Sequence, residues 1–96
     1  MVDNYNLSKH FEQAADDIKK FKPDMNNDEL KLLYGLFKQA TIGDNNTEAP
    51  SFYQLKEKGK WQGWTDQKGK SKDQARHEYV QLVLKKIPKD AQASYQ

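Results

Sequence analysis

The segment YGLFKQATIGDNN, residues 34–46, joins a helical pattern to a polar loop that starts at Gly43. Tyr34 and Lys38 stand one helical turn apart, so they share a face of the expected helix. A phenol ring can stack on a flat ligand, and a lysine ammonium with its three donors suits a phosphate. The same pair also fits an ordinary surface on which a half-buried tyrosine packs against a lysine stem. Taken alone, the spacing favours the ordinary surface.

The helix around Tyr34 extends back to a clear start signal. Asn26 followed by Glu29 is typical of a capping box, and Gly43 is typical of a helix end. The apolar stripe of this helix, which we assign to the core, consists of Leu30, Leu33, Phe37 and Ala40.

Two further segments with the helical period lie on either side of this helix. The first would begin at an N-cap at Ser8 and stop at Pro23, and the other would cover about residues 54–67. Their apolar positions are Phe11, Ala14, Ala15 and Ile18, and then Leu55, Trp61 and Trp64. No segment of useful length alternates as a β-strand does.

A fourth helix is predicted between Ser71 and Pro88. Ser71 with Gln74 forms a capping-box pattern, and Pro88 removes a backbone donor and ends the helix. Its apolar positions are Ala75, Tyr79, Leu82, Val83 and Ile87. Residues 88–96 offer little to bury, so we expect a frayed tail.

The lengths of the connections predict the topology. About four residues join helix 1 to helix 2, and about four join helix 3 to helix 4, which favours antiparallel neighbours. Residues 43–53 are long enough to cross over one end of the bundle, so that helices 2 and 3 run in the same direction. The predicted fold class is an all-α four-helix bundle with a long crossover between helices 2 and 3, in the order up-down-down-up. A bundle of this kind can leave a shallow bowl between its helices.

Length and composition restrict the classes of protein further. The 96 residues fit a single domain, residues 1–96, and the absence of cysteine excludes disulfides, zinc–thiolate sites and cysteine nucleophiles. The longest apolar stretch is too short to span a membrane, and the N-terminus lacks the pattern of a signal peptide. We therefore expect a soluble, cytoplasmic protein. Residues 1–50 carry six Lys and nine acids, whereas residues 51–96 carry ten Lys or Arg and five acids, so the second half is basic.

Catalysis finds little support in the residues. His10 and His77 are the only imidazoles, and neither has a partner in a recognisable catalytic arrangement. No glycine-rich phosphate loop and no calcium loop is present. We therefore expect no enzyme activity, no catalytic residue, no metal and no cofactor. Two binding classes stay open beside a phosphate-rich small ligand: a small single-stranded nucleic-acid binder, which the small net charge and acidic first half disfavour, and a protein-interaction helical bundle.

Three sequence blocks, in order, resemble one known family. YGLFKQATIGDNN is followed by KEKGKWQGWTDQKGKSKDQA and then by EYV. Together they closely resemble the acyl-CoA-binding protein family, over about residues 8–87. The resemblance implies a four-helix bundle that holds one long-chain fatty acyl-CoA in a bowl and performs no chemistry. It further implies an intracellular carrier or buffer in fatty acid metabolism and transport, a monomer that binds no nucleic acid and does not insert stably into membranes.

The resemblance also implies a set of ligand-binding residues. Tyr34 and Lys38 would hold the adenine and the ribose 3′-phosphate, and Lys60 would support the same phosphate-rich region. Tyr79 would pack on the nucleotide or its linker, and Lys19 would add a cationic contact.

Four positions depart from the family pattern. Ser51 follows Pro50 where glycine is usual, which would change a loop and little else. Phe37 stands where the family often has a second tyrosine, so it would contact the ligand without a phenolic hydrogen bond. Leu30 replaces a common methionine and would still contact the acyl chain. Lys31 replaces an apolar residue and could narrow the acyl-contact surface or cover it with its stem.

Overall fold

The computed structural model describes residues 7–95 and consists of helices and their connections. The four main helices are α1 (Leu7–Phe21), α2 (Asn27–Thr41), α3 (Leu55–Thr65) and α4 (Lys72–Leu84); a short α5 (Lys89–Gln92) and a 3-10 turn η1 (Ala93–Tyr95) follow. No strand occurs between residues 7 and 95. Residues 1–6, where no signal peptide was expected, and Gln96 of the tail lie outside the described residues.

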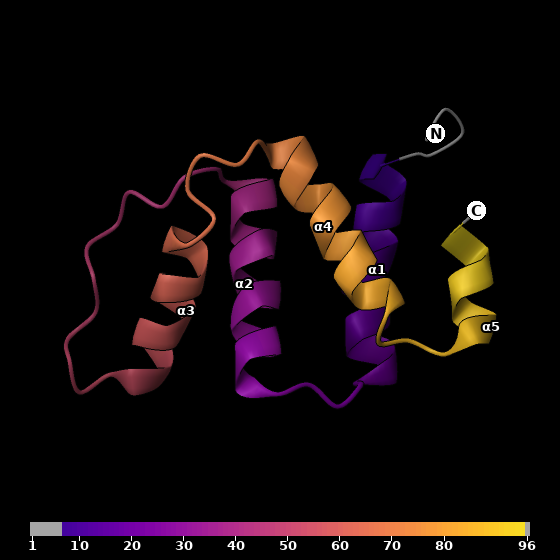
Figure 1. Ribbon diagram of the computed structural model, residues 1–96, viewed down its shortest axis with the longest axis horizontal. Helices are drawn as coiled ribbons and strands as arrows, with labels where there is room; N and C mark the ends of the chain where they lie inside the picture. The colour runs from indigo at the N-terminus through magenta and orange to yellow at the C-terminus, as the bar shows by residue number, and fades with distance from the viewer. Residues whose placement is uncertain (1–6, 96) are drawn as a thin grey trace.

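The chain path confirms the predicted topology. Helix α2 runs opposite to α1, α3 runs in the same direction as α2, and α4 returns (Figure 1). The long connection between α2 and α3 crosses from one end of the bundle to the other. The structure therefore has the all-α, up-down-down-up arrangement with its crossover between helices 2 and 3.

One expectation about neighbouring helices was wrong. Helix α2 packs on both α3 and α4, and α4 packs on α1 (Figure 1). Helices α3 and α4, and likewise α1 and α2, were expected to be neighbours because their connections are short. Instead, α2 lies between α3 and α4, and α1 packs mainly on α4. The resulting molecule is flat, with extents of 42 × 27 × 16 Å, so its helices keep wide exposed faces.

Both ends of α2 lie where the sequence signals predicted them. The Glu29 amide donates to Asn26 Oδ1 at 2.8 Å, and the Asn26 amide donates to Glu29 Oε1 at 3.0 Å, which completes the capping box. Gly43 ends the helix with a φ of 104°, a left-handed conformation that favours glycine. Lys86, which follows α4, forms an ion pair with Glu29 and so ties the start of α2 to the end of α4.

Two other cap predictions need correction. Ser8 was expected to be an N-cap, but α1 already includes Leu7. Ser71 does cap α4, because its Oγ accepts the Gln74 amide at 3.0 Å. The Gln74 side chain donates to Glu78 at 2.7 Å instead of returning to the cap, so the expected capping box is only half formed.

The core faces of the helices differ in part from the predicted stripe. Leu30 and Phe37 were assigned to the core, but they are 49% and 37% exposed. Leu36, which is 1% exposed, takes the central position on α2 instead. The α2 pattern fits two stripes of similar spacing, and the buried cluster includes the one through Leu36. The buried hydrophobic cluster consists of Phe11, Ala14, Leu33, Leu36, Ala40, Ala75, Tyr79, Val80, Val83, Ile87 and Tyr95.

The C-terminal tail was expected to be frayed, and this was wrong for residues 88–95. Pro88 precedes the short helix α5, and Tyr95 at the end of η1 is only 5% exposed. The Tyr95 hydroxyl donates to Asp17 Oδ2 at 2.7 Å, and its ring lies 5.5 Å from the His10 ring. These contacts with α1 hold a segment whose own sequence has almost no helical period.

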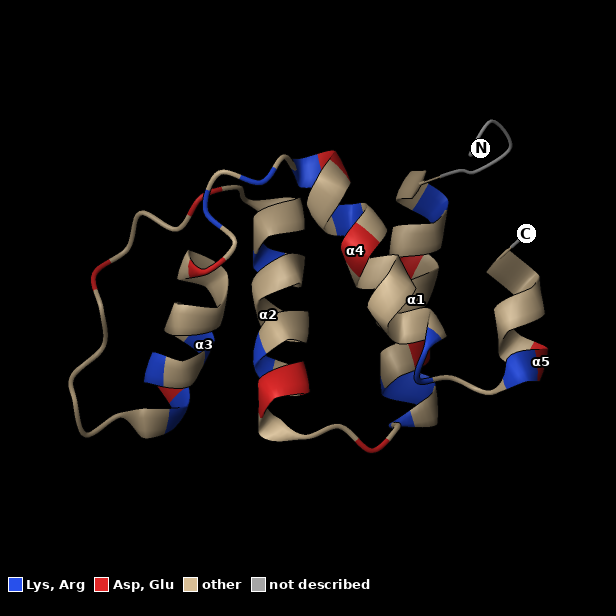
Figure 2. Ribbon diagram, in the orientation of Figure 1, with Lys and Arg blue, Asp and Glu red and all other residues tan. Residues whose placement is uncertain are grey.

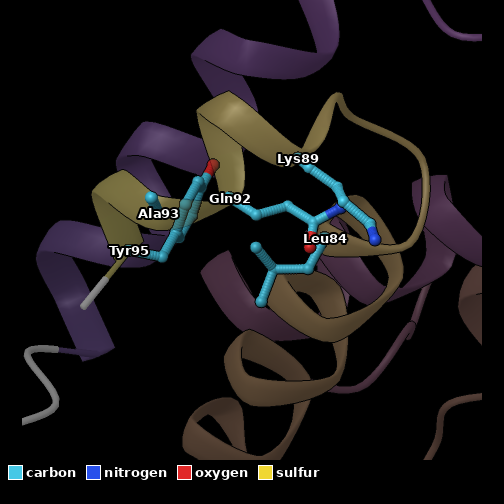
Figure 3. Close-up of a pocket in the computed structure, with 5 residues that line it drawn as sticks. All are labelled: Leu84, Lys89, Gln92, Ala93 and Tyr95. Atoms are coloured by element: carbon cyan, nitrogen blue, oxygen red, sulfur yellow. The ribbon is translucent and has the colours of Figure 1, made fainter.

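A small hollow remains where the tail leaves α4. Leu84 of α4 and Gln92 and Tyr95 of the tail line it, and its volume is about 360 Å³ (Figure 3). The Gln92 side chain donates to the carbonyl of Ile87 at 3.1 Å, which fixes the turn between the two helices. None of the helices within residues 7–95 is long and apolar enough to cross a membrane.

Candidate functional site

Helices α2 and α3 approach so closely that their backbones touch. A Cβ atom on Gly35 would overlap the carbonyl oxygen of Gly63, and one on Gly63 would overlap the carbonyl oxygen of Lys31. The Lys31 stem also lies against Gly63. Only glycine fits at both positions, so this contact fixes how the neighbouring side chains of α2 and α3 face each other.

Two lysine–aromatic contacts cross this helix pair in opposite directions. Lys60 Nζ of α3 lies 5.6 Å from the centre of the Tyr34 ring of α2. Lys38 Nζ of α2 lies 4.9 Å from the ring of Trp64 on α3. Tyr34 and Lys38 are half-buried, and Lys60 is exposed. We call these four residues the cation–aromatic face; Figure 2 shows the basic segments of α2 and α3 that surround it.

A second cluster joins α1, α2 and α4. The Phe11 ring lies 5.6 Å from the Phe37 ring and 5.0 Å from the Tyr79 ring, and Phe37 lies 5.9 Å from Tyr79. Tyr79 is 4% exposed, and burial raises the pKa of its phenol to about 12, so it stays protonated at neutral pH. Phe37 is the most exposed of the three and borders a hollow of about 580 Å³ that Ala15 and Arg76 also line.

Helix α2 connects the two groups. Phe37 and Lys38 follow Tyr34 by three and four residues, so both lie beside it on the helix surface. Leu30 precedes Tyr34 by one turn and is half exposed on the same stripe. The exposed stripe of α2 therefore runs from an apolar side chain through the Tyr34 ring to the Lys38 ammonium.

The structure brings together most of the residues predicted for the site, but not all. Tyr34, Lys38 and Lys60 meet at the cation–aromatic face, and Phe37 and Tyr79 meet in the aromatic cluster. Lys19 is exposed in the last turn of α1, and none of the side-chain contacts found within residues 7–95 links it to the other candidates.

The GDNN segment, residues 43–46, forms hydrogen bonds that hold the start of the crossover in place. Asp44 Oδ1 accepts the Gly69 amide at 2.9 Å and the Gln39 side chain at 2.8 Å. These bonds, the one from Gly69 first, lower the pKa of the Asp44 carboxyl. Asn45 Nδ2 donates to Thr65 Oγ1 at 3.0 Å. The polar loop after α2 therefore binds protein groups and positions α3 against α2.

Sequence reasoning missed three residues that shape the site. Trp64, counted only among apolar positions, provides the ring under Lys38, and its Nε1 donates to the carbonyl of Gly43 at 2.7 Å. Gly35 and Gly63 were not recognised as a contact pair. Glycines in the middle of two expected helices were the available signal, because such positions cost stability unless something requires them.

Comparisons with known proteins agree with one another. The family model described as Acyl CoA binding protein matches residues 8–83. Acyl-CoA-binding protein homolog 1 of Caenorhabditis elegans is 48% identical over 79 residues, which cover 82% of this chain and 92% of that protein. The acyl-CoA-binding protein of Saccharomyces cerevisiae is 41% identical over 83 residues, 86% of this chain and 95% of that one.

Solved structures give the same result. The crystal structure of Oryza sativa Acyl-CoA-Binding Protein 2 matches with a TM-score of 0.80 and 35% identity, covering 95% of this chain and all of that chain. The structure of ACBP from Moniliophthora perniciosa matches with a TM-score of 0.74 and 29% identity, covering 90% and 89%. The chain therefore belongs to the acyl-CoA-binding protein family.

Proposed function

We propose that this protein binds one long-chain fatty acyl-CoA thioester, with the nucleotide head on the cation–aromatic face and the chain along the apolar part of the same surface. One observation carries this proposal: Lys60 lies over Tyr34 and Lys38 lies over Trp64, across a helix contact that only glycine permits. Rings and ammonium groups are thus held in one place, as a phosphorylated nucleotide requires. Membership of the acyl-CoA-binding protein family supports the same ligand.

Lys38 and Lys60 would gain binding free energy by leaving the aromatic rings and contacting the phosphates of the ligand. A lysine over an aromatic ring contributes about 0.5–1 kcal/mol at an exposed site and about 2 kcal/mol where the contact is desolvated. A charge-assisted hydrogen bond contributes roughly 1.5–3 kcal/mol. Lys38 and Lys60 would therefore turn to the phosphates when the ligand arrives. The released Tyr34 ring would be free to stack on the adenine, which is worth about 1–3 kcal/mol.

The acyl chain supplies most of the affinity. Each methylene removed from water contributes roughly 0.8 kcal/mol, so ten give about 8 kcal/mol before the costs of ordering the ligand. Leu30 and Phe37 are exposed large apolar side chains on the α2 stripe and would contact the chain. Tyr79 would act through Phe37, since it is almost fully buried behind that ring. Lys19 would add a contact from the end of α1.

The biological role follows from the ligand. A protein that covers a detergent-like molecule and releases it intact is a carrier or buffer in fatty acid metabolism. We place it in the cytoplasm as a monomeric, single-domain binding protein without enzyme activity, metal or cofactor. The nucleic-acid and protein-interaction alternatives gain no support from the family match.

Titration calorimetry with palmitoyl-CoA, CoA and palmitate tests the proposal. We expect one site per chain for palmitoyl-CoA, far weaker binding of CoA and poor binding of palmitate. Equal affinities for CoA and palmitoyl-CoA would contradict the assigned role of the chain. Native mass spectrometry of the purified protein offers an independent check, because a co-purified acyl-CoA adduct identifies the ligand class directly.

A further inference from the structure

The crossover between α2 and α3 presents two aromatic rings on a closed turn. Phe52 and Tyr53 occupy the centre of the turn formed by residues 51–54. The Gln54 amide donates to the carbonyl of Ser51 at 2.9 Å, and the Ser51 amide donates to Gln54 Oε1 at 3.1 Å. The turn is therefore held at its base on both sides.

The apolar side chains of this turn point away from the protein. Phe52, Tyr53 and Leu55 are 80%, 73% and 77% exposed, and no other large hydrophobic side chain within residues 7–95 is as exposed as these three. The two rings contact each other edge to face at 5.7 Å, so they form one cluster. We call these three residues the apolar tip. The turn leads directly into the start of α3, the helix at the opposite end of the molecule from the C-terminal tail (Figure 1).

Lysines directly follow the apolar tip. Lys56, Lys58 and Lys60 lie on the first turns of α3 and are all exposed, with Glu57 as the only acid among residues 51–60 (Figure 2). An exposed apolar cluster beside several lysines combines the two features by which proteins bind the surface of anionic membranes. The cluster is a projection, not a groove, so it suits insertion between lipid head groups better than the capture of a helix.

We propose that the apolar tip inserts into the head-group region of membranes that contain anionic lipids, with Lys56 and Lys58 against the head groups. This interaction goes beyond acyl-CoA binding and requires no ligand. Lys60 follows Lys56 by one turn and lies over Tyr34, so α3 leads from the tip to the cation–aromatic face. A docked protein would hold its ligand site close to the surface in which acyl chains partition; this last step alone rests on the proposed function.

Co-sedimentation with vesicles tests the proposal without any acyl-CoA. The protein is mixed with vesicles of phosphatidylcholine alone, or of an equal mixture of phosphatidylcholine and phosphatidylserine. We expect binding to the mixed vesicles and much weaker binding to the neutral ones. The Phe52→Ser/Leu55→Ser double variant should bind the mixed vesicles at least about tenfold more weakly, because it loses two large apolar groups. Ile42→Ser is the matched control, since Ile42 is 54% exposed at the far end of α2.

Charge reversal tests the lysines separately. Lys58→Glu should weaken binding to mixed vesicles by roughly fivefold or more, because it replaces an attraction to the anionic surface with a repulsion. Lys85→Glu changes net charge equally at an exposed position after α4 and should have much less effect. Palmitoyl-CoA affinity of the Phe52→Ser/Leu55→Ser variant should equal that of the wild type, which separates docking from ligand binding.

A fluorescent label gives a second measurement, which reports the part of the bound protein that enters the membrane. The chain has no cysteine, so Phe52→Cys and Ile42→Cys each offer a single labelling site. A polarity-sensitive dye at position 52 should shift to the blue with mixed vesicles, whereas the dye at position 42 should not. Three results would overturn the proposal: no vesicle binding by the wild type, unchanged binding by the Phe52→Ser/Leu55→Ser variant, or a tip that mediates self-association instead.

Discussion

Helices α2 and α3 meet through backbone atoms, whereas α1 and α4 meet through buried side chains. The α2–α3 contact lacks interlocking side chains at its centre, because Gly35 and Gly63 occupy it. The α1–α4 region contributes Ala14, Val80 and Val83, all with 0% exposure. The first arrangement leaves rings and ammonium groups on the surface, and the second removes apolar groups from water. The cation–aromatic face therefore lies on the α2–α3 pair, whereas the side chains with 0% exposure named here lie on α1 and α4.

Gly63→Ala should have the largest effect on the contact between α2 and α3, because it forces the two backbones apart. The added Cβ would overlap a backbone oxygen of α2 that cannot rotate away. We expect the free energy of unfolding to fall by about 3 kcal/mol, together with a loss of palmitoyl-CoA affinity. Urea unfolding and calorimetric titration measure the two effects.

Gly59→Ala is the matched control on the same helix. Nothing lies within 4 Å of its added Cβ, so the substitution should stabilise the protein by about 0.5–1 kcal/mol. If the two alanine variants had the same stability, the close contact between α2 and α3 would be wrong.

Lys38→Ala should weaken ligand binding without disturbing the fold. Its ammonium lies over Trp64 and its side chain is half-buried. Alanine favours the helix at least as well as lysine, so the helix should form without this side chain. We expect palmitoyl-CoA binding to weaken by more than about tenfold, because a charge-assisted phosphate contact is lost, with nearly unchanged helicity by circular dichroism. Lys85→Ala, after α4, is the control. Normal ligand binding by Lys38→Ala would remove Lys38 from the site.

Tyr95→Phe should lower stability without changing ligand binding. The variant keeps the ring against His10 but loses the hydrogen bond to Asp17, which measures 2.7 Å. The free energy of unfolding should fall by about 1 kcal/mol in urea titrations, while palmitoyl-CoA affinity stays the same. A change in affinity with unchanged stability would show that the tail serves the ligand site instead of the fold.

Glu29→Gln should have the smallest effect and should depend on pH. The hydrogen bond from Lys86, followed by that from the Asn26 amide, lowers the pKa of the Glu29 carboxyl below its ordinary value of 4.5. The stabilisation is therefore fully present above pH 4.5 and is lost as the pH falls through the lowered pKa.

The variant keeps a capping group at the same position but cannot form the ion pair with Lys86. Its melting temperature should fall less steeply than that of the wild type as the solution is acidified below pH 4.5. Parallel curves for the two proteins would exclude this ion pair as a source of acid sensitivity.

Local signals were sufficient to predict most of the fold from the sequence. Asn26 and Glu29 cap α2 because the residues that form the bonds are neighbours in the chain. The crossover and the direction of α3 followed from loop length. The choice between Leu36 and Phe37 as the buried residue could not be made in this way, because both fit a helical period and only the tertiary packing decides which one is buried.

The candidate site was only partly accessible to such reasoning. The spacing of Tyr34 and Lys38 placed them on one face, but the position of Lys60 over Tyr34 depends on the crossing of two helices. That crossing is set by Gly35 and Gly63, whose sequence separation hides their contact. The tail could not be predicted either, because Tyr95 is held by Asp17 and not by its own neighbours.

The docked tail has a practical consequence for anyone who trims this protein for expression. The family match ends at residue 83, inside a helix that continues to Leu84, and the buried side chains of Ile87 and Tyr95 lie beyond it. A fragment cut at that boundary would retain every proposed ligand contact and still lack part of its folding unit. The end of the family match and the end of the folding unit are therefore different positions in this chain.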